Sequence, residues 1–222
     1  MRVGRLSCGS LAIAATVAAL VPAGAGAVAA DVWQVQLTPA GQAAARATVL
    51  KRSVLGGAGW TGGSKKADTS DASPCPSFKP KQSDLVLIGA ADAEWKQAGI
   101  NIESQVNVLQ TAKMVRLDWQ RTVLPAQVLP CLRSGLSKAV APGTLVSFKR
   151  MTFPSLGSYS RAYRGVIALK SAAGTTRVLV DTIAFGRGRS EVTLLLAAPA
   201  AAAAALRPLE LRLSRLLAAR AR

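Results

Sequence analysis

Few residues in this chain are candidates for catalysis. Among its acidic side chains, one pair could act together as catalytic carboxyl groups. Asp181 and Glu191 fall on adjacent predicted strands, so an Asp/Glu-dependent hydrolase is one hypothesis. The chain contains no His, which excludes Ser-His-Asp and Cys-His catalysis. Asp181 also fits an ion pair with Arg164 or Arg177 on a neighbouring strand, and we favour this structural interpretation. We therefore expect no catalytic residue, no metal site and no cofactor.

Four arginines in the last third of the chain are the candidate ligand-binding residues. Arg161 and Arg164 belong to one predicted strand, whereas Arg187 and Arg189 belong to the Gly-Arg-Gly-Arg turn at 186–189. Exposed arginines at such a turn could hold an anionic ligand. The turn lacks the Lys-Ser/Thr ending of a phosphate-binding loop and leads into a strand instead of a helix. An ordinary solvated turn stays open as the alternative.

The first 29 residues have the three parts of a secretory signal peptide. Arg2 and Arg5 give a positive start, 11–21 is an apolar run, and 27–29 offers an A-x-A cleavage site. An uncleaved membrane anchor is the alternative, although the apolar run is short for crossing a bilayer. We expect a secreted protein of the cell envelope.

Two cysteines follow this segment, Cys75 and Cys131. An even number of cysteines in an exported chain predicts one disulfide. Closing a loop of about 55 residues would contribute on the order of 4 kcal/mol to stability. Two separate thiols are the alternative, and the spacing fits no zinc pattern.

The chain is strongly basic, with a formal net charge of +17. Such a charge favours contact with polyanions, so an anionic envelope polymer or lipid head groups are the expected partners. A solvated basic surface, typical of an Arg- and Ala-rich proteome, is the alternative. We expect no nucleic acid as a partner, because export separates the protein from it and aromatic residues are rarely interleaved with the basic ones.

The elements that must position these residues are predicted from periodicity and turn signals. Three β-rich runs between 159 and 196 are joined by two short Gly-bearing turns, which predicts a β-meander whose central strand is covered on both faces. The remaining predicted strands lie at 84–90, 100–108 and 144–153, a loop is expected at 91–99, and helices are expected after Thr38, after Thr111 and over 126–138.

The C-terminal stretch 206–222 predicts an amphipathic helix with a leucine face and arginine flanks. We expect this helix to cover the sheet as a lid. The alternative is a helix on a membrane surface, which would make the chain a peripheral membrane protein.

Together these patterns predict an α+β fold, in which an antiparallel sheet of about five to six strands ends in the β-meander, packs against helices and carries one disulfide. The predicted organisation is a signal peptide at 1–29, an N-terminal helix at 30–55, a flexible loop or linker at 56–83 and a core domain at 84–222. The segment 30–55 is expected to pack on that core.

In outline the chain resembles the secreted sensor-type domains of actinobacterial proteins. Examples are the extracellular domain of the PknH type of receptor kinase and, more distantly, the PsbP type of α+β sandwich. The resemblance covers roughly 32–222 and is carried by Cys75, Cys131, the Tyr163-Arg164 strand start and the final helix. It implies ligand binding in a cleft between sheet and helix, and it assigns no site residue. This chain lacks the second disulfide typical of those domains. We expect a non-enzymatic ligand-binding or sensor-like domain that favours anionic ligands.

Overall fold

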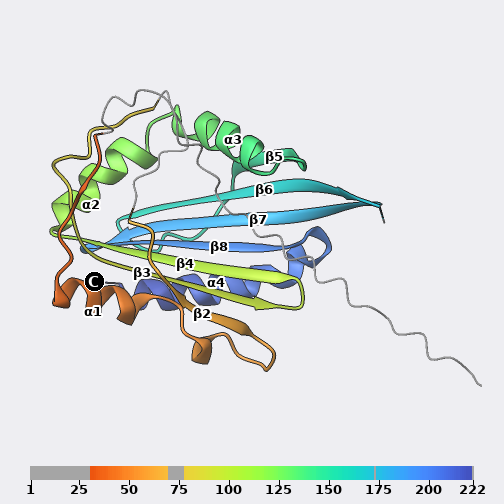
Figure 1. The fold of residues 1–222 in the computed structure, drawn as a ribbon, viewed down its shortest axis with the longest axis horizontal. Coiled ribbons are helices and arrows are strands. Elements are labelled where there is room, and N and C mark those ends of the chain that lie inside the picture. The colour runs from red at the N-terminus through yellow and green to blue at the C-terminus, as the bar shows by residue number, and fades with distance from the viewer. Residues whose placement is uncertain (1–30, 70–77, 173, 222) are drawn as a thin grey trace, which may run out of the picture.

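A single mixed sheet organises the molecule in the computed structural model, which describes residues 31–69, 78–172 and 174–221. Its strand order is β1-β3-β4-β8-β7-β6-β5, and β2 also pairs with β3 (Figure 1). All neighbouring strands are antiparallel except β1 and β3. The strands are β1 (Gln34–Val35), β2 (Thr61–Lys65), β3 (Val86–Gln97), β4 (Ile100–Leu109), β5 (Thr144–Arg150), β6 (Tyr159–Ser171), β7 (Gly174–Arg187) and β8 (Ser190–Pro199).

The predicted α+β class and the β-meander are confirmed, while the sheet is larger than expected. The meander is formed by β6, β7 and β8, which pair in sequence order. The described strands form an eight-stranded sheet instead of five to six strands, and parallel β1 makes it mixed. Two polar stretches expected to be loops account for part of the difference.

The first of these stretches is 91–99. There β3 continues to Gln97, and a two-residue turn at Ala98 and Gly99 leads into β4. Both turn residues have positive φ, 45° and 81°, as a tight hairpin turn requires. The second is the segment 56–83, which contains β2. Because β2 is Thr-Gly-Gly-Ser-Lys, backbone pairing with β3 holds it in place, and its side chains gave no strand signal.

Helices cover both faces of the sheet. The helices are α1 (Pro39–Thr48), α2 (Ala112–Asp118), its π-helical continuation η2 (Trp119–Val123), α3 (Val128–Ala139) and α4 (Ala203–Arg220), with short 3₁₀ turns η1 (Arg52–Val54) and η3 (Ala200–Ala202). The predicted N-caps are confirmed, because Thr38 Oγ1 accepts from Gly41 N at 3.0 Å and Thr111 Oγ1 accepts from Met114 N at 3.2 Å.

The C-terminal helix is the predicted lid. Leu206, Leu213 and Leu217 of α4 are at most 3% exposed, and α4 packs on β7 and β8. On the opposite face Val115 and Trp119 of α2 and η2 form a second cluster with Tyr159 and Ala184. The central strand β7 is therefore covered on both sides, and its alternate residues Ile183 and Phe185 belong to the α4 cluster.

Two predictions fall partly or wholly outside the described residues. The signal peptide at 1–29 is outside them. Cys75 is also outside them, so the bond to Cys131 stays a prediction; Cys131 itself is half-buried on α3. No helix in the described part of the chain is long and apolar enough to span a membrane.

Candidate functional site

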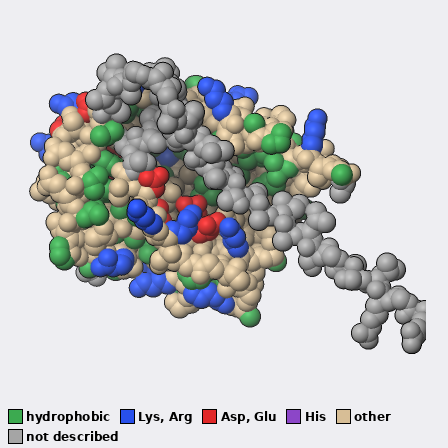
Figure 2. Space-filling model, viewed as in Figure 1, with side chains coloured by type: hydrophobic (Ala, Val, Ile, Leu, Met, Phe, Trp, Pro, Cys, Tyr) green, Lys and Arg blue, Asp and Glu red, His purple; other side chains and the backbone are tan. Residues whose placement is uncertain are grey.

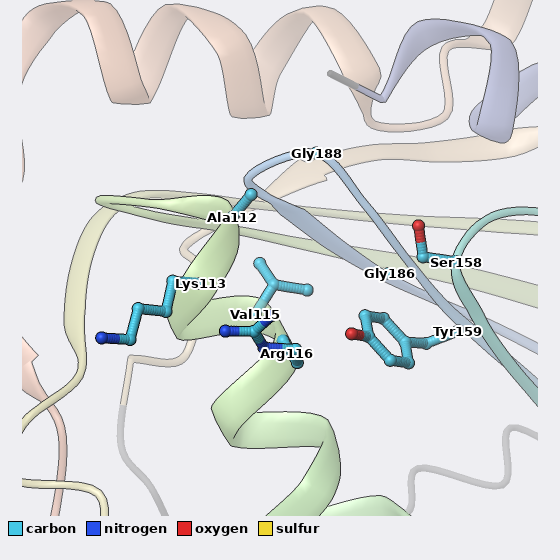
Figure 3. Close-up of a pocket in the computed structure, with 8 residues that line it drawn as sticks. All are labelled: Ala112, Lys113, Val115, Arg116, Ser158, Tyr159, Gly186 and Gly188. Carbon is cyan, nitrogen blue, oxygen red and sulfur yellow. The ribbon is translucent and has the colours of Figure 1, made fainter.

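A surface pocket of about 330 Å³ lies between α2 and the adjoining ends of β6 and β7. Figure 3 shows the Tyr159 ring opposite Val115, with its hydroxyl directed toward the α2 side. Lys113 extends along the rim, away from Tyr159. The lining consists of Ala112, Lys113, Val115, Arg116, Ser158, Tyr159, Gly186 and Gly188.

The position of α2 explains which of its side chains reach the pocket. Val115 and Trp119 are 1% and 2% exposed because they face the sheet, so Lys113 and Arg116 are left on the exposed side. Trp119 stacks on Tyr159 with a centroid distance of 5.7 Å. Gly186 permits this packing, because a Cβ there would lie 2.9 Å from Val115 Cγ1 and 3.0 Å from Trp119 Nε1.

The pocket is electrostatically positive. Its lining holds one lysine and one arginine and no acidic residue. Within the described part of the chain, neither Lys113 nor Arg116 forms a salt bridge. An anion entering the pocket would therefore meet Arg116, and also Lys113 once its side chain turns inward, with neither held by a salt bridge.

Unlike the cations of the pocket, the charged side chains of β2, β3 and β4 are paired with opposite charges. There acidic and basic side chains lie next to one another near the middle of the face shown in Figure 2. Lys65 Nζ lies 3.2 Å from Glu94 and 3.5 Å from Glu103, and Lys96 Nζ lies 2.9 Å from Glu94. Because these charges balance one another, we expect the pocket beside α2 to attract an anion more strongly than this group does.

A buried carboxyl pair joins Asp118, the last residue of α2, to Glu191 of β8. Asp118 accepts from Gln82 Nε2 at 3.0 Å and from Thr122 Oγ1 at 3.2 Å, and it hydrogen-bonds to Glu191. Burial raises the pKa of Glu191 well above its usual range, and the neighbouring Asp118 raises it further. Glu191 is therefore the protonated donor, so the pair carries one negative charge, on Asp118, instead of two.

The carboxyl pair considered for hydrolysis is not assembled. Glu191 lies opposite Gly186 in the ladder, whereas Asp181 lies opposite Leu196. Since side chains alternate along a strand, Asp181 shares the α4 face with Leu196 and Glu191 lies on the other face. The two carboxyls cannot act on one substrate.

Asp181 is held in a buried ionic network, as the favoured interpretation predicted. Arg164 Nε donates to Asp181 Oδ1 at 2.7 Å, and Arg164 Nη2 donates to Asp181 Oδ2. Glu210 of α4 lies 3.6 Å from Arg164 and 3.3 Å from Arg207. Asp181 is 1% exposed and Glu210 is fully buried. Arg177, the other predicted partner, is exposed on β7.

The four candidate arginines do not form one cluster. Arg164 is engaged by Asp181, and Arg187 Nη1 donates to Ala218 O of α4 at 2.7 Å. Arg189 is exposed in the turn next to Gly188, which lines the pocket beside α2. Arg161 lines a separate pocket at the edge of β6.

Sequence reasoning missed Lys113 and Arg116. The available signal was their spacing, because positions three apart on a helix lie on neighbouring parts of its surface. Val115 and Trp119 marked the buried side of that helix, so the cations had to point elsewhere. That they meet Tyr159 and Gly186 depends on how α2 docks, which periodicity does not reveal.

The site offers cations and hydroxyls and lacks a metal cluster. Among the described residues, no group of three His, Cys, Asp or Glu side chains could hold a metal ion. Comparison of the chain with protein-family models, curated proteins and solved structures gave no match.

Proposed function

We propose that this protein is a non-enzymatic domain, exported to the cell envelope, that binds an anionic ligand in the pocket beside α2. One observation carries the proposal: Lys113 and Arg116 line a pocket of about 330 Å³ that contains no acidic residue. Two cations without carboxylate partners attract an anion more strongly than any balanced charge group on the surface.

The pocket suits a small anionic group or one unit of a polymer. Its volume is near the lower end of typical ligand sites. The hydroxyls of Ser158 and Tyr159 supply further hydrogen-bond donors beside the cations. Lys113 is exposed, and an exposed lysine changes rotamer within nanoseconds, so it can turn toward a bound anion.

The envelope location rests on the sequence. The segment 1–29 has the pattern of a secretory signal, and the net charge of +17 favours polyanionic partners. A phosphate-bearing envelope polymer is the partner that fits both features. An anionic lipid head group has the same chemistry and is distinguished by the experiment below.

The membrane-surface alternative has less support. It relied on the leucine face of α4, and Leu213 and Leu217 are fully buried against the sheet. A membrane would have to take those leucines away from the sheet, which would leave the apolar face of β7 and β8 under α4 uncovered.

Isothermal titration calorimetry at low salt tests the proposal, with inorganic phosphate, poly(glycerol phosphate) and phosphatidylglycerol vesicles as three probes. The double variant Lys113→Gln/Arg116→Gln should bind the preferred probe at least tenfold more weakly, since charged hydrogen bonds contribute about 1.5–3 kcal/mol each. The matched control is Arg133→Gln/Lys138→Gln, which removes the same charge from exposed positions of α3. Equal losses in both double variants would attribute binding to net charge alone, and the proposed site would be wrong.

A further inference from the structure

A second pocket, of about 410 Å³, lies at the outer edge of β6. The ladder between β5 and β6 ends at Arg150 and Tyr163, and one further bond, Met151 N to Ala162 O at 2.8 Å, follows it. Beyond this point the chain leaves the sheet and opens the pocket. The lining consists of Arg150, Met151, Thr152, Phe153, Ser160, Arg161, Ala162 and Ile183.

One part of the lining is apolar and firmly placed. Ala162 and Ile183 are 2% and 1% exposed and belong to the core under α4. Phe153 and Met151 also pack on that core from the departing chain. Because Met151 and Phe153 are only partly buried, their aliphatic and aromatic surface can cover an apolar group and remove it from water.

The departing chain is fixed to α4 by Arg207. Its Nη2 donates to Thr152 O at 2.9 Å, and its guanidinium lies 4.6 Å from the centre of the Phe153 ring. This cation–π contact and hydrogen bond hold the pocket wall in place without a ligand. The pocket is thus formed by the fold itself.

The other part of the lining is cationic. Arg161 Nη1 donates to Ser160 O at 2.9 Å, so its guanidinium lies against the edge of β6. Arg150 lies opposite Tyr163 in the ladder between β5 and β6. Burial raises the pKa of the Tyr163 phenol, and the charges of Arg161 and Arg150 oppose that rise. In the described part of the chain neither arginine has a salt-bridge partner.

We propose that this second pocket binds an amphipathic anion, with a short apolar tail on Met151 and Phe153 and a carboxylate or similar head group at Arg150 and Arg161. An anchored apolar floor beside two unneutralised guanidiniums fits such a molecule better than a fully hydrated anion. This site is separate from the pocket beside α2 and does not depend on the function proposed for it.

The two methionines that follow the signal segment allow the pockets to be observed separately. Met151 lines the second pocket, whereas Met114 lies on α2 among residues that line the first. NMR of ¹³C-methyl methionine in the full chain can follow both during titration with octanoate, kept below its micelle-forming concentration. The Met151 signal should shift and saturate at a lower octanoate concentration than any shift of the Met114 signal.

Acetate and 1-octanol separate the contribution of the apolar tail from that of the charged head group, since acetate lacks the tail and 1-octanol lacks the charge. Both should bind at least tenfold more weakly than octanoate. The variant Arg150→Gln/Arg161→Gln should weaken octanoate binding at least tenfold, while the control Arg133→Gln/Arg177→Gln, at exposed positions outside both pockets, should leave it unchanged.

Two wild-type results would overturn the proposal without any variant. One is equal affinity for octanoate and acetate at Met151, and the other is no shift of Met151 with octanoate. A phosphate titration that shifts only the Met114 signal would support the first pocket whatever octanoate does at Met151. The two proposals can therefore fail independently.

Discussion

At the scale of single residues, the most constrained group is the network of Arg164, Asp181, Arg207 and Glu210. A fully buried glutamic acid beside a buried aspartate is costly unless one of them is protonated or both have cationic partners. Here two arginines and one shared proton meet that requirement. The network connects β6, β7 and α4, so it specifies how the C-terminal helix docks.

Removing one partner of the central ion pair should destabilise the fold. The variant Arg164→Met leaves Asp181 uncompensated at 1% exposure, and we expect a loss of about 3 kcal/mol in the free energy of unfolding at pH 7. The double variant Arg164→Met/Asp181→Leu should recover most of this loss. Arg177→Met, an exposed position on the same sheet, is the control and should change stability by less than about 0.5 kcal/mol. Urea denaturation measures all three, and equal stability of Arg164→Met and the control would contradict the buried pair.

Glu210 should make stability depend on pH. Burial, together with the neighbouring Asp181, raises its pKa from 4.5 to about 7 in the folded protein. Between these two values the unfolded chain loses the proton first, so stability falls as the pH rises. The resulting loss in the free energy of unfolding is at most about 3 kcal/mol.

The variant Glu210→Gln carries no titrating proton, so that contribution should disappear. Denaturant titrations at pH 4.5 and pH 7 should show a smaller decrease for Glu210→Gln than for the wild type. Other buried carboxyls, such as Glu191, act in the same direction in both proteins and cancel in the comparison. An identical decrease in the two proteins would show that Glu210 ionises normally.

At the scale of elements, the close contact between α2 and β7 positions the first pocket. Gly186→Ala would place a Cβ 2.9 Å from Val115 Cγ1, so α2 must move. We expect a loss of about 1–3 kcal/mol in stability and weaker phosphate binding. Gly63→Ala is the control, because its Cβ would meet nothing within 4 Å. Thermal denaturation of both variants checks the expectation, and equal melting temperatures would show that α2 does not need this contact.

The elements that the sequence predicted well are those in which local chemistry and burial agree. In β4 the apolar residues alternate with polar ones, and Thr38 and Thr111 cap helices at the expected positions. The stretch 91–97 of β3 was missed because one of its faces carries Asp92, Glu94 and Lys96, which pair with polar neighbours instead of a core. Strand β2 was missed because glycines give no periodic signal.

The site was less predictable than the fold. Arg161 and Arg164 are three residues apart on one strand, and alternation places their side chains on opposite faces. One lines a pocket and the other joins the buried network. Because the two arginines are close in sequence, a single cluster was expected, but strand geometry places them at different sites. The cations of the first pocket come from α2, and only tertiary docking places them beside the turn of the meander.

At the scale of the whole molecule, the predicted disulfide would tie the segment before β3 to α3. If Cys75 and Cys131 are bonded, reduction should lower the free energy of unfolding by about 4 kcal/mol. Denaturation with and without dithiothreitol measures this difference, and a Cys131→Ser variant should be insensitive to the reductant. Thiol reactivity at both Cys75 and Cys131 in the unreduced, unfolded protein would contradict the bond.

The central claim is that an anion occupies the pocket beside α2. Amide NMR of the full chain during titration with inorganic phosphate tests it most directly, because each pocket residue reports its own environment. We predict saturable shifts concentrated at 112–116, Ser158, Gly186 and Gly188, which shrink in Lys113→Gln/Arg116→Gln. Shifts spread over exposed lysines and arginines across the surface, or no saturable shift at these residues, would contradict the account.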